Sequence, residues 1–170
     1  PMPETGLTFE QYPHVLQASM GVVTPTGTGT YTYEYAVPTD DTVPELQTYT
    51  LLLGNKLVSA DVAALLYSHV YEWEASGEAG GNWTISASWR GNRYTTGSFA
   101  SVSLPTVEDA IFAKTKLYID AQAGTIGTTQ KTGVLVGASI KYSANVEFVP
   151  VGDGSLYAIA HKLGQPSVTF

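Results

Sequence analysis

The sequence predicts a mainly-β protein, with antiparallel strands in a sandwich or barrel-like core and one or two short flanking helices. Apolar and polar residues alternate on both sides of a glycine-rich loop between Ser68 and Arg90, the pattern of a β-hairpin. The chain is rich in strand-favouring aromatics, with 11 Tyr and 3 Trp. Its 17 Gly and 9 Pro supply the turns that short strands need.

The length and composition predict one domain over residues 1–170. The chain has 44% hydrophobic and 14% charged residues, values typical of a globular protein with a substantial core. The start at Pro1 and the strand-like last residues, Ser-Val-Thr-Phe, suggest that the sequence is trimmed at one or both ends.

One short helix is predicted near the start of the chain. Thr8 and Gln11 have the spacing of a capping box. Pro13 is suited to the first turn of a helix, and Gly21 is suited to the position after its end. We therefore expect a helix over residues 13–20.

Two strands are predicted before the hairpin. Tyr31, Tyr33 and Tyr35 alternate with smaller or polar residues, and residues 48–53 form a second strand-like run. Residues 57–67 fit a helix and a strand equally well, because their apolar residues satisfy both periods.

The hairpin itself is predicted to have one buried and one polar face, because successive side chains of a strand point to opposite faces. The buried set is His69, Tyr71, Trp73 and Ala75 on the first strand, with Trp83, Ile85, Ala87 and Trp89 on the second. The polar set is Glu72, Glu74 and Ser76, with Thr84, Ser86, Ser88 and Arg90, and Val70 falls on its side. The polar face thus carries two glutamates and a row of hydroxyls.

Shorter elements are predicted in the second half of the chain. Residues 91–105 form a long irregular stretch, a length typical of functional or disordered loops. Strands are expected over 116–120 and 134–143, with a glycine-rich loop at 124–129 and a turn at 152–154.

Catalytic and metal chemistry have little support. The absence of cysteine excludes disulfides and thiolate metal sites, and His14, His69 and His161 lack the spacing of metal ligands. We therefore expect no metal, no cofactor and no catalytic residue. A weaker alternative is a hydrolase that uses Glu72 or Glu74 as acid or base, although glycosidases usually bring their two carboxylates from different strands.

A second alternative is a β-sandwich carbohydrate-binding module. The aromatic residues that would line its sugar-binding face are Tyr31, Tyr33, Tyr35, Trp73, Trp83 and Trp89. Core and cross-strand packing is the commoner role of such residues.

The net charge argues against tight binding of nucleic acid, and the short apolar runs argue against a membrane span. The net charge is −7, and residues 1–80 hold ten acidic residues against Lys56 alone, whereas residues 81–170 hold five acidic and seven basic residues. This polarity suits either self-association or simple solubility. No apolar run reaches the roughly 18–20 residues of a membrane span.

Several segments in order resemble the tail tube (major tail) proteins of long-tailed bacteriophages. The segments are Leu7–Met20, Tyr31–Tyr35, Tyr49–Gly54, Ser76–Gly91, Thr115–Asp120, Gly124–Thr129 and Gly154–Tyr157. The most specific part of this set is the hairpin Trp-Thr-Ile-Ser-Ala, followed by Leu-Tyr-Ile-Asp and Gly-Thr-Ile-Gly-Thr-Thr.

The resemblance implies a structural virion protein and not an enzyme. Homo-hexameric rings would stack into a tube around a tape-measure protein and meet tail terminator and tip proteins. The tube would be assembled in the host cytoplasm and would pass double-stranded DNA without binding it specifically.

The resemblance also implies roles for particular residues. The expected lumen-lining residues are Glu72, Glu74, Thr84, Ser86 and Ser88. The expected contacts between subunits or rings are Arg90, Arg93, Tyr94 and Phe99, on an arm formed by residues 91–105.

Overall fold

The computed structural model describes residues 5–29, 31–37, 45–54, 62–99, 103, 105–125, 127–154, 157–158 and 160–170. The fold is mainly β and sandwich-like, with a large antiparallel sheet and one α-helix in the described residues. Its elements are β1 Thr5–Gly6, α1 Tyr12–Met20, β2 Tyr49–Gly54, β3 Val62–Glu78, β4 Thr84–Arg90, β5 Arg93–Thr96, a 3-10 helix Phe112–Lys114, β6 Leu117–Tyr118, β7 Gln130–Lys131, β8 Gly137–Ser143, β9 Val146–Val149, β10 Ala160–Leu163 and β11 Ser167–Thr169.

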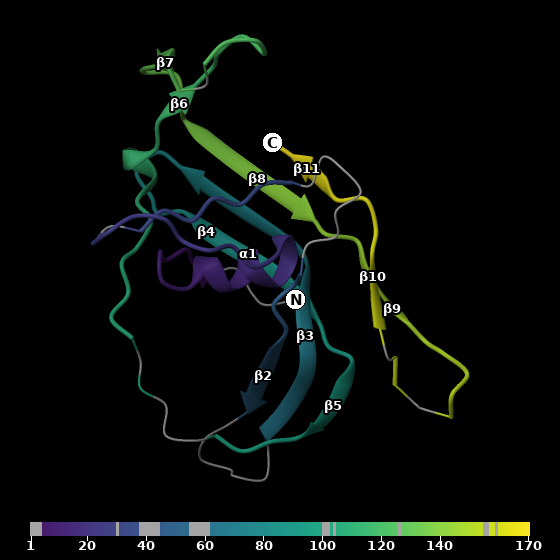
Figure 1. Ribbon diagram of the computed structural model, residues 1–170. Helices are drawn as coiled ribbons and strands as arrows, with labels where there is room; N and C mark the ends of the chain where they lie inside the picture. The colour runs from purple at the N-terminus through teal and green to yellow at the C-terminus, as the bar shows by residue number, and fades with distance from the viewer. Residues whose placement is uncertain are drawn as a thin grey trace.

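The 17-residue strand β3 organises the whole sheet (Figure 1). Its second half lies between β4 and β8 in the order β1-β4-β3-β8-β11, and its first half lies between β2 and β5. Every pairing is antiparallel. The pairs β9–β10 and β6–β7 form two small separate ladders. The single strand β3 therefore belongs to two parts of the sheet. Its second half lies in the main part, β1-β4-β3-β8-β11, and its first half lies in a three-stranded arm with β2 and β5.

A β-bulge at Tyr71 changes which residues of β3 face the core. The register of β3 against β4 shifts between Val70 and Glu72. Val70 and Trp73 consequently both enter the core, three positions apart. The prediction that His69 and Tyr71 share the face of Trp73 is therefore wrong, because strict alternation cannot continue through an extra residue.

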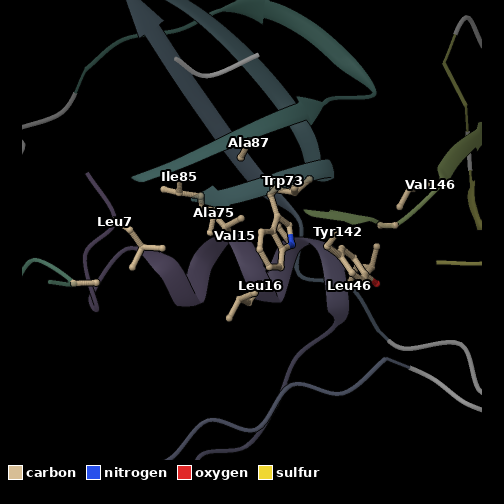
Figure 2. Close-up of a cluster of buried hydrophobic side chains, with 14 residues drawn as sticks. Leu7, Val15, Leu16, Leu46, Trp73, Ala75, Ile85, Ala87, Tyr142 and Val146 are labelled. Carbon is tan, nitrogen blue, oxygen red and sulfur yellow. The ribbon is translucent and has the colours of Figure 1, made fainter. Parts of the chain in front are cut away.

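The helix α1 covers one face of the sheet, as Figure 2 shows for the side chains at this interface. Val15 and Leu16 of α1 pack with Trp73, Ala75 and other residues of the main core cluster. That cluster comprises Leu7, Val15, Leu16, Ala18, Leu46, Val70, Trp73, Ala75, Ile85, Ala87, Ala110, Tyr142, Ala144 and Val146. The buried faces predicted for Trp73, Ala75, Ile85 and Ala87 are confirmed.

The predicted helix is confirmed as Tyr12–Met20, with its proline at the start and its glycine at the end. The capping box predicted at Thr8 and Gln11 is wrong, because Gln11 occupies the N-cap position and its side chain makes no capping hydrogen bond. Thr8 Oγ1 accepts a hydrogen bond from the Gln11 N–H at 3.3 Å in the turn that precedes the helix, and Pro13 lies in the first turn of α1. Gly21 follows the helix with a φ of 110°, a conformation that a glycine adopts without strain.

The strand predicted at Tyr31–Tyr35 is absent from the described residues. An isolated bridge between Thr26 and Thr32 closes a turn there, and Tyr35 and Val37 pack against the core instead of pairing in a sheet. An alternating sequence favours an extended chain, but a strand also requires a partner edge.

The strand pairings settle the remaining expectations about strands and loops. Residues 62–67 belong to β3, so the strand interpretation of this ambiguous segment is the right one, while residues 57–61 lie outside the described part. The irregular stretch predicted at 91–105 is wrong over Arg93–Thr96, which pairs with β3 as β5. The strands expected at 116–120 and 134–143 are shortened to β6 and β8, whereas β2 and β4 match their predictions.

Candidate functional site

The candidate site is the sheet face opposite α1, which three strand pairings bring together. Residues paired across neighbouring strands share a face. We name this surface the hydroxyl face; it consists of Glu72, Glu74 and Ser76 on β3, Thr84, Ser86 and Ser88 on β4, Ser139, Lys141 and Ser143 on β8, and Ser167 and Thr169 on β11. All five predicted lumen-lining residues lie on it.

The hydroxyl face is arranged in level rows across the strands. The first row contains Ser167, Ser143, Glu72 and Ser88, the second contains Thr169, Lys141, Glu74 and Ser86, and the third contains Ser139, Ser76 and Thr84. Short side chains make each row low, and their hydroxyls both donate and accept hydrogen bonds. The result is a shallow polar surface with few long side chains.

The charges of the hydroxyl face are two carboxylates and one ammonium. Lys141 Nζ lies 3.1 Å from Glu72 Oε1, and Lys141 pairs in register with Glu74. The single lysine therefore has a carboxylate partner on its own face, and the face keeps a net negative charge. Its hydroxyls also bond to one another, as Ser76 Oγ and Thr84 Oγ1 do at 3.2 Å.

A shallow hollow of about 670 Å³ lies at the end of the hydroxyl face. Its lining includes Ser76, Glu78, Asn82, Thr84, Ser139 and Phe170. The hollow is lined mainly by small and polar groups, so it continues the chemistry of the rows beside it.

The sheet that carries the hydroxyl face has two open edges. On one side, β1 pairs only with Thr84 and Ile85, so β4 from Ser86 to Arg90 has no outer partner within the described chain. On the other side, β11 is the last strand that the described residues place in the order. Edges of this kind have backbone groups free to pair with another strand.

The four predicted contact residues do not form one cluster. The Arg90 guanidinium carbon lies 3.8 Å from the centre of the Tyr71 ring, a cation–π contact beside the bulge. Arg93 lies 5.0 Å from the ring of Tyr157. Tyr94 on β5 is 71% exposed, and Phe99 follows β5 and is half-buried.

The three tryptophans pack on the inner side of the sheet. Trp73 Nε1 donates to Ser19 Oγ at 3.1 Å, and Trp83 Nε1 donates to Thr115 Oγ1 at 2.9 Å. Trp89 makes an edge-to-face contact with Tyr49. Their rings are therefore engaged in packing, and the exposed aromatics of the proposed sugar-binding set are Tyr31 and Tyr33.

Metal-binding groups are not gathered at this face. In the part of the chain that the structure describes, no group of three or more His, Asp or Glu side chains is placed to hold a metal ion. Within the same residues, no helix combines the length and apolar character that a membrane crossing needs.

Comparison with protein-family models, with curated proteins and with solved structures finds no match to this chain.

Sequence reasoning missed half of the hydroxyl face. Ser139, Lys141 and Ser143 alternate with Ala138, Ile140 and Tyr142, and this alternation predicted a strand. The local sequence contains no signal that β8 pairs with β3. The polar side of β8 could therefore not be assigned to the same face as Glu72. The signal that was available is the matching row of hydroxyls on each strand.

Proposed function

We propose that this chain is a structural subunit that assembles with its own copies into stacked rings, forming the tail tube of a long-tailed bacteriophage. The observation that carries the proposal is the hydroxyl face, a four-stranded polar surface bordered by open edges at β4 and β11. The further partners are a tape-measure protein, terminator and tip proteins, and double-stranded DNA in transit. The place of the protein is the virion tail.

The directions of the strands support ring formation. Each neighbouring pair in β4-β3-β8-β11 is antiparallel, so β4 and β11 run in opposite directions. Rotation about an axis along the strands brings β11 of one copy beside β4 of the next without reversing either. The new pair, which we call the seam, is then antiparallel like the rest. Such a head-to-tail contact closes into a ring when the rotation divides a full circle.

The size of a closed wall is compatible with a passage. Six copies of four strands, spaced about 4.8 Å apart, give a wall at least about 37 Å across at the backbone, and strand tilt widens it. Because the hydroxyl face carries mostly serine and threonine, its side chains leave the centre open.

The chemistry of the hydroxyl face suits the passage of a polyanion. Binding of DNA depends mainly on Lys and Arg contacts to phosphates. Lys141 is paired with Glu72, and Glu74 adds a second carboxylate, so phosphates meet net repulsion. Hydroxyls supply hydration without a fixed charge. A wall of this composition lets DNA move instead of holding it.

The arm of β2, β3 and β5 supports contacts between rings. Leu53 is 79% exposed, Tyr94 is 71% exposed and Tyr67 is 60% exposed, a large apolar surface for a solitary molecule. Near the other end of β3, Leu7, Phe9, Trp83 and Ile111 help line an apolar groove of about 280 Å³. We place the arm of one ring against this groove of the next ring.

The proposal is tested with engineered cysteines, because the natural chain has none. Ser86→Cys or Ser88→Cys on β4 is combined with Ser167→Cys or Thr169→Cys on β11, in all four combinations. Oxidation of the assembled protein is expected to give covalent multimers up to one fixed size, the number of subunits in a ring. Each single-cysteine variant is the control and forms no species beyond a dimer.

Negative-stain images of the wild-type protein at high concentration are expected to show rings or tubes. The proposal is contradicted if the protein stays monomeric at millimolar concentration and none of the four double-cysteine variants forms disulfide-linked multimers. Tight binding of a glycan by that monomer would favour the carbohydrate-binding alternative.

A further inference from the structure

His69 on β3 is buried beneath the β9–β10 hairpin. Its side chain is 2% exposed, and neither ring nitrogen has a hydrogen-bond partner among the described residues. The ring centre lies 5.2 Å from that of Phe148 on β9, at an interplanar angle of 31°. It lies 4.9 Å from the ring centre of His161 on β10. The hairpin thus contacts β3 through tilted ring contacts that include two imidazoles.

Among the described residues, no carboxylate forms a hydrogen bond with His69. Phe148 and His161 pair in register and face β3, whereas their neighbours Glu147 and Lys162 pair with each other on the opposite side of the hairpin.

On the strands beside His69, the charged groups have other partners or are cationic. Arg90 of β4 pairs in register with His69 and holds its guanidinium over Tyr71. Arg93 of β5 lies over Tyr157, and Glu72 on β3 is bound to Lys141. A proton on His69 would therefore place a second cation among cations.

We propose that the β9–β10 hairpin is an acid-released latch on β3, closed while the buried His69 is uncharged and opened when His69 is protonated. Burying an imidazolium without an acceptor is costly, and a second positive ring in contact with it adds repulsion. Opening the hairpin exposes the His69 ring to water and moves it away from His161, which removes both costs. This latch is independent of the proposed self-assembly.

The titration of His69 gives the pH range of release. Burial, followed by the charge of His161, lowers the pKa of His69 from 6.5 to about 4. The closed form therefore binds a proton less tightly than the open form. Its stabilisation is complete above pH 6.5 and declines as the pH falls from 6.5 towards 4. At pH 5 this linkage corresponds to an increase of about 30-fold in the open population.

The test is hydrogen exchange of the full chain at pH 7.5, 6 and 5, corrected for the intrinsic pH dependence of exchange. Amides of β9 and β10 are expected to lose about 30-fold in protection between pH 7.5 and 5. Amides of the β3–β4 ladder are expected to keep theirs. His69→Phe retains an aromatic ring but no titratable group, so its hairpin is expected to stay protected at pH 5.

His14→Phe is the matched control, because His14 lies on α1 and contacts Tyr49 instead of the hairpin. This variant is expected to show the full wild-type loss. Unchanged protection of the wild-type hairpin at pH 5, or an equal loss in His69→Phe, overturns the proposal. If His69→Phe does not fold, His161→Phe replaces it: a smaller loss supports the latch, and an undiminished loss overturns it.

Discussion

Single side chains tie the helix to the sheet in this fold. Trp73 contacts Tyr12 edge-to-face at 5.7 Å and stacks with Tyr142 at 5.9 Å. Its indole N–H also donates to Ser19 Oγ, whose own hydroxyl donates to the carbonyl of Val15. One ring therefore joins β3, β8 and α1 through packing and through a buried polar contact.

Truncation of this ring is expected to be severe. Trp73→Ala should lower the free energy of unfolding by about 3–5 kcal/mol, because it empties a large volume in the core. Ser19→Ala, which removes the acceptor of the indole N–H and the donor to the Val15 carbonyl, should cost about 1–3 kcal/mol. Chemical denaturation followed by circular dichroism measures both values. Equal losses in the two variants would contradict the dominant role given to the ring.

A second residue-scale contact organises the loop between β6 and β7. The Asp120 carboxylate accepts hydrogen bonds from the N–H groups of Gly127, Thr128 and Thr129 at 2.8, 3.1 and 2.9 Å. The Thr128 hydroxyl donates to it at 2.8 Å. These bonds, those from Thr129 and Thr128 most of all, hold the pKa of Asp120 well below its usual range.

The loop is therefore expected to keep its turn in mild acid. A depressed pKa means that the stabilisation is present above pH 3.8 and is lost only as the pH falls through the lower value of the folded state. Amide signals of Gly127, Thr128 and Thr129 should stay unchanged when an NMR titration passes pH 3.8. Asp120→Asn should shift all three at neutral pH. Signals that move at pH 3.8 in the wild type would refute this account.

At the scale of elements, the bulge at Tyr71 decides which residues of β3 face the core on each side of it. Before the bulge Val70 faces the core, and after it Trp73 does. Removal of Tyr71 alone would restore regular alternation through Val70, Glu72 and Trp73. Removal of one residue after the bulge would instead reverse the faces of everything on one side of the deletion.

Two deletions distinguish these cases. Deletion of Tyr71 should leave a folded protein that has lost the Arg90 stacking contact, at a cost of about 1–2 kcal/mol. Deletion of Glu74 should prevent folding, because Trp73 and Ala75 can no longer both reach the core, and each large buried side chain contributes about 1.5–3 kcal/mol. Thermal unfolding compares the two. Similar melting temperatures would show that the register of β3 is not fixed by its core face.

The elements that sequence reasoning predicted are those with strong local signals. The helix at Tyr12–Met20 has a proline in its first turn and a terminal glycine, and the hairpin of β3 and β4 has long alternating runs. The bulge at Tyr71 and the pairing of β5 with β3 carry no such signal, because both depend on partners distant in sequence. The prediction of a strand from the alternating tyrosines at 31–35 was wrong for the same reason, because a strand also depends on a partner elsewhere in the chain.

At the scale of the whole molecule, the polarity of the hydroxyl face is its most consequential property. If the proposed tube forms, replacing Glu72 and Glu74 with lysine converts a repelling wall into a binding one. Assembled tubes of Glu72→Lys/Glu74→Lys are expected to retain DNA fragments, protected from nuclease, in low salt and to release them in high salt. Virions that carry this variant should eject their genome more slowly.

The matched control changes the same charge elsewhere. Glu34 and Glu45 are exposed and lie outside the hydroxyl face, so Glu34→Lys/Glu45→Lys alters the net charge equally. Its tubes should give DNA no protection from nuclease. Equal protection by both double variants would contradict the placement of the hydroxyl face on the inner wall.

The candidate site was predictable only in part, and the division follows the sheet. Glu72 and Ser86 lie on neighbouring strands of one hairpin, so local alternation placed them together. Lys141 and Ser167 join the same face through strands that return from far along the chain. Lys141 matters most, because its contact with Glu72 decides how much charge the face presents.

Among the described residues, β4 and β11 form two different edges of the sheet, and this has a consequence for the growth of the proposed rings, if they form. An incomplete arc of any number of copies still presents one β4 border and one β11 border, so it remains able to accept another copy. Only the copy that completes the circle removes both at once. Curved fragments should therefore be short-lived and reactive, and finished circles should be inert at their sides.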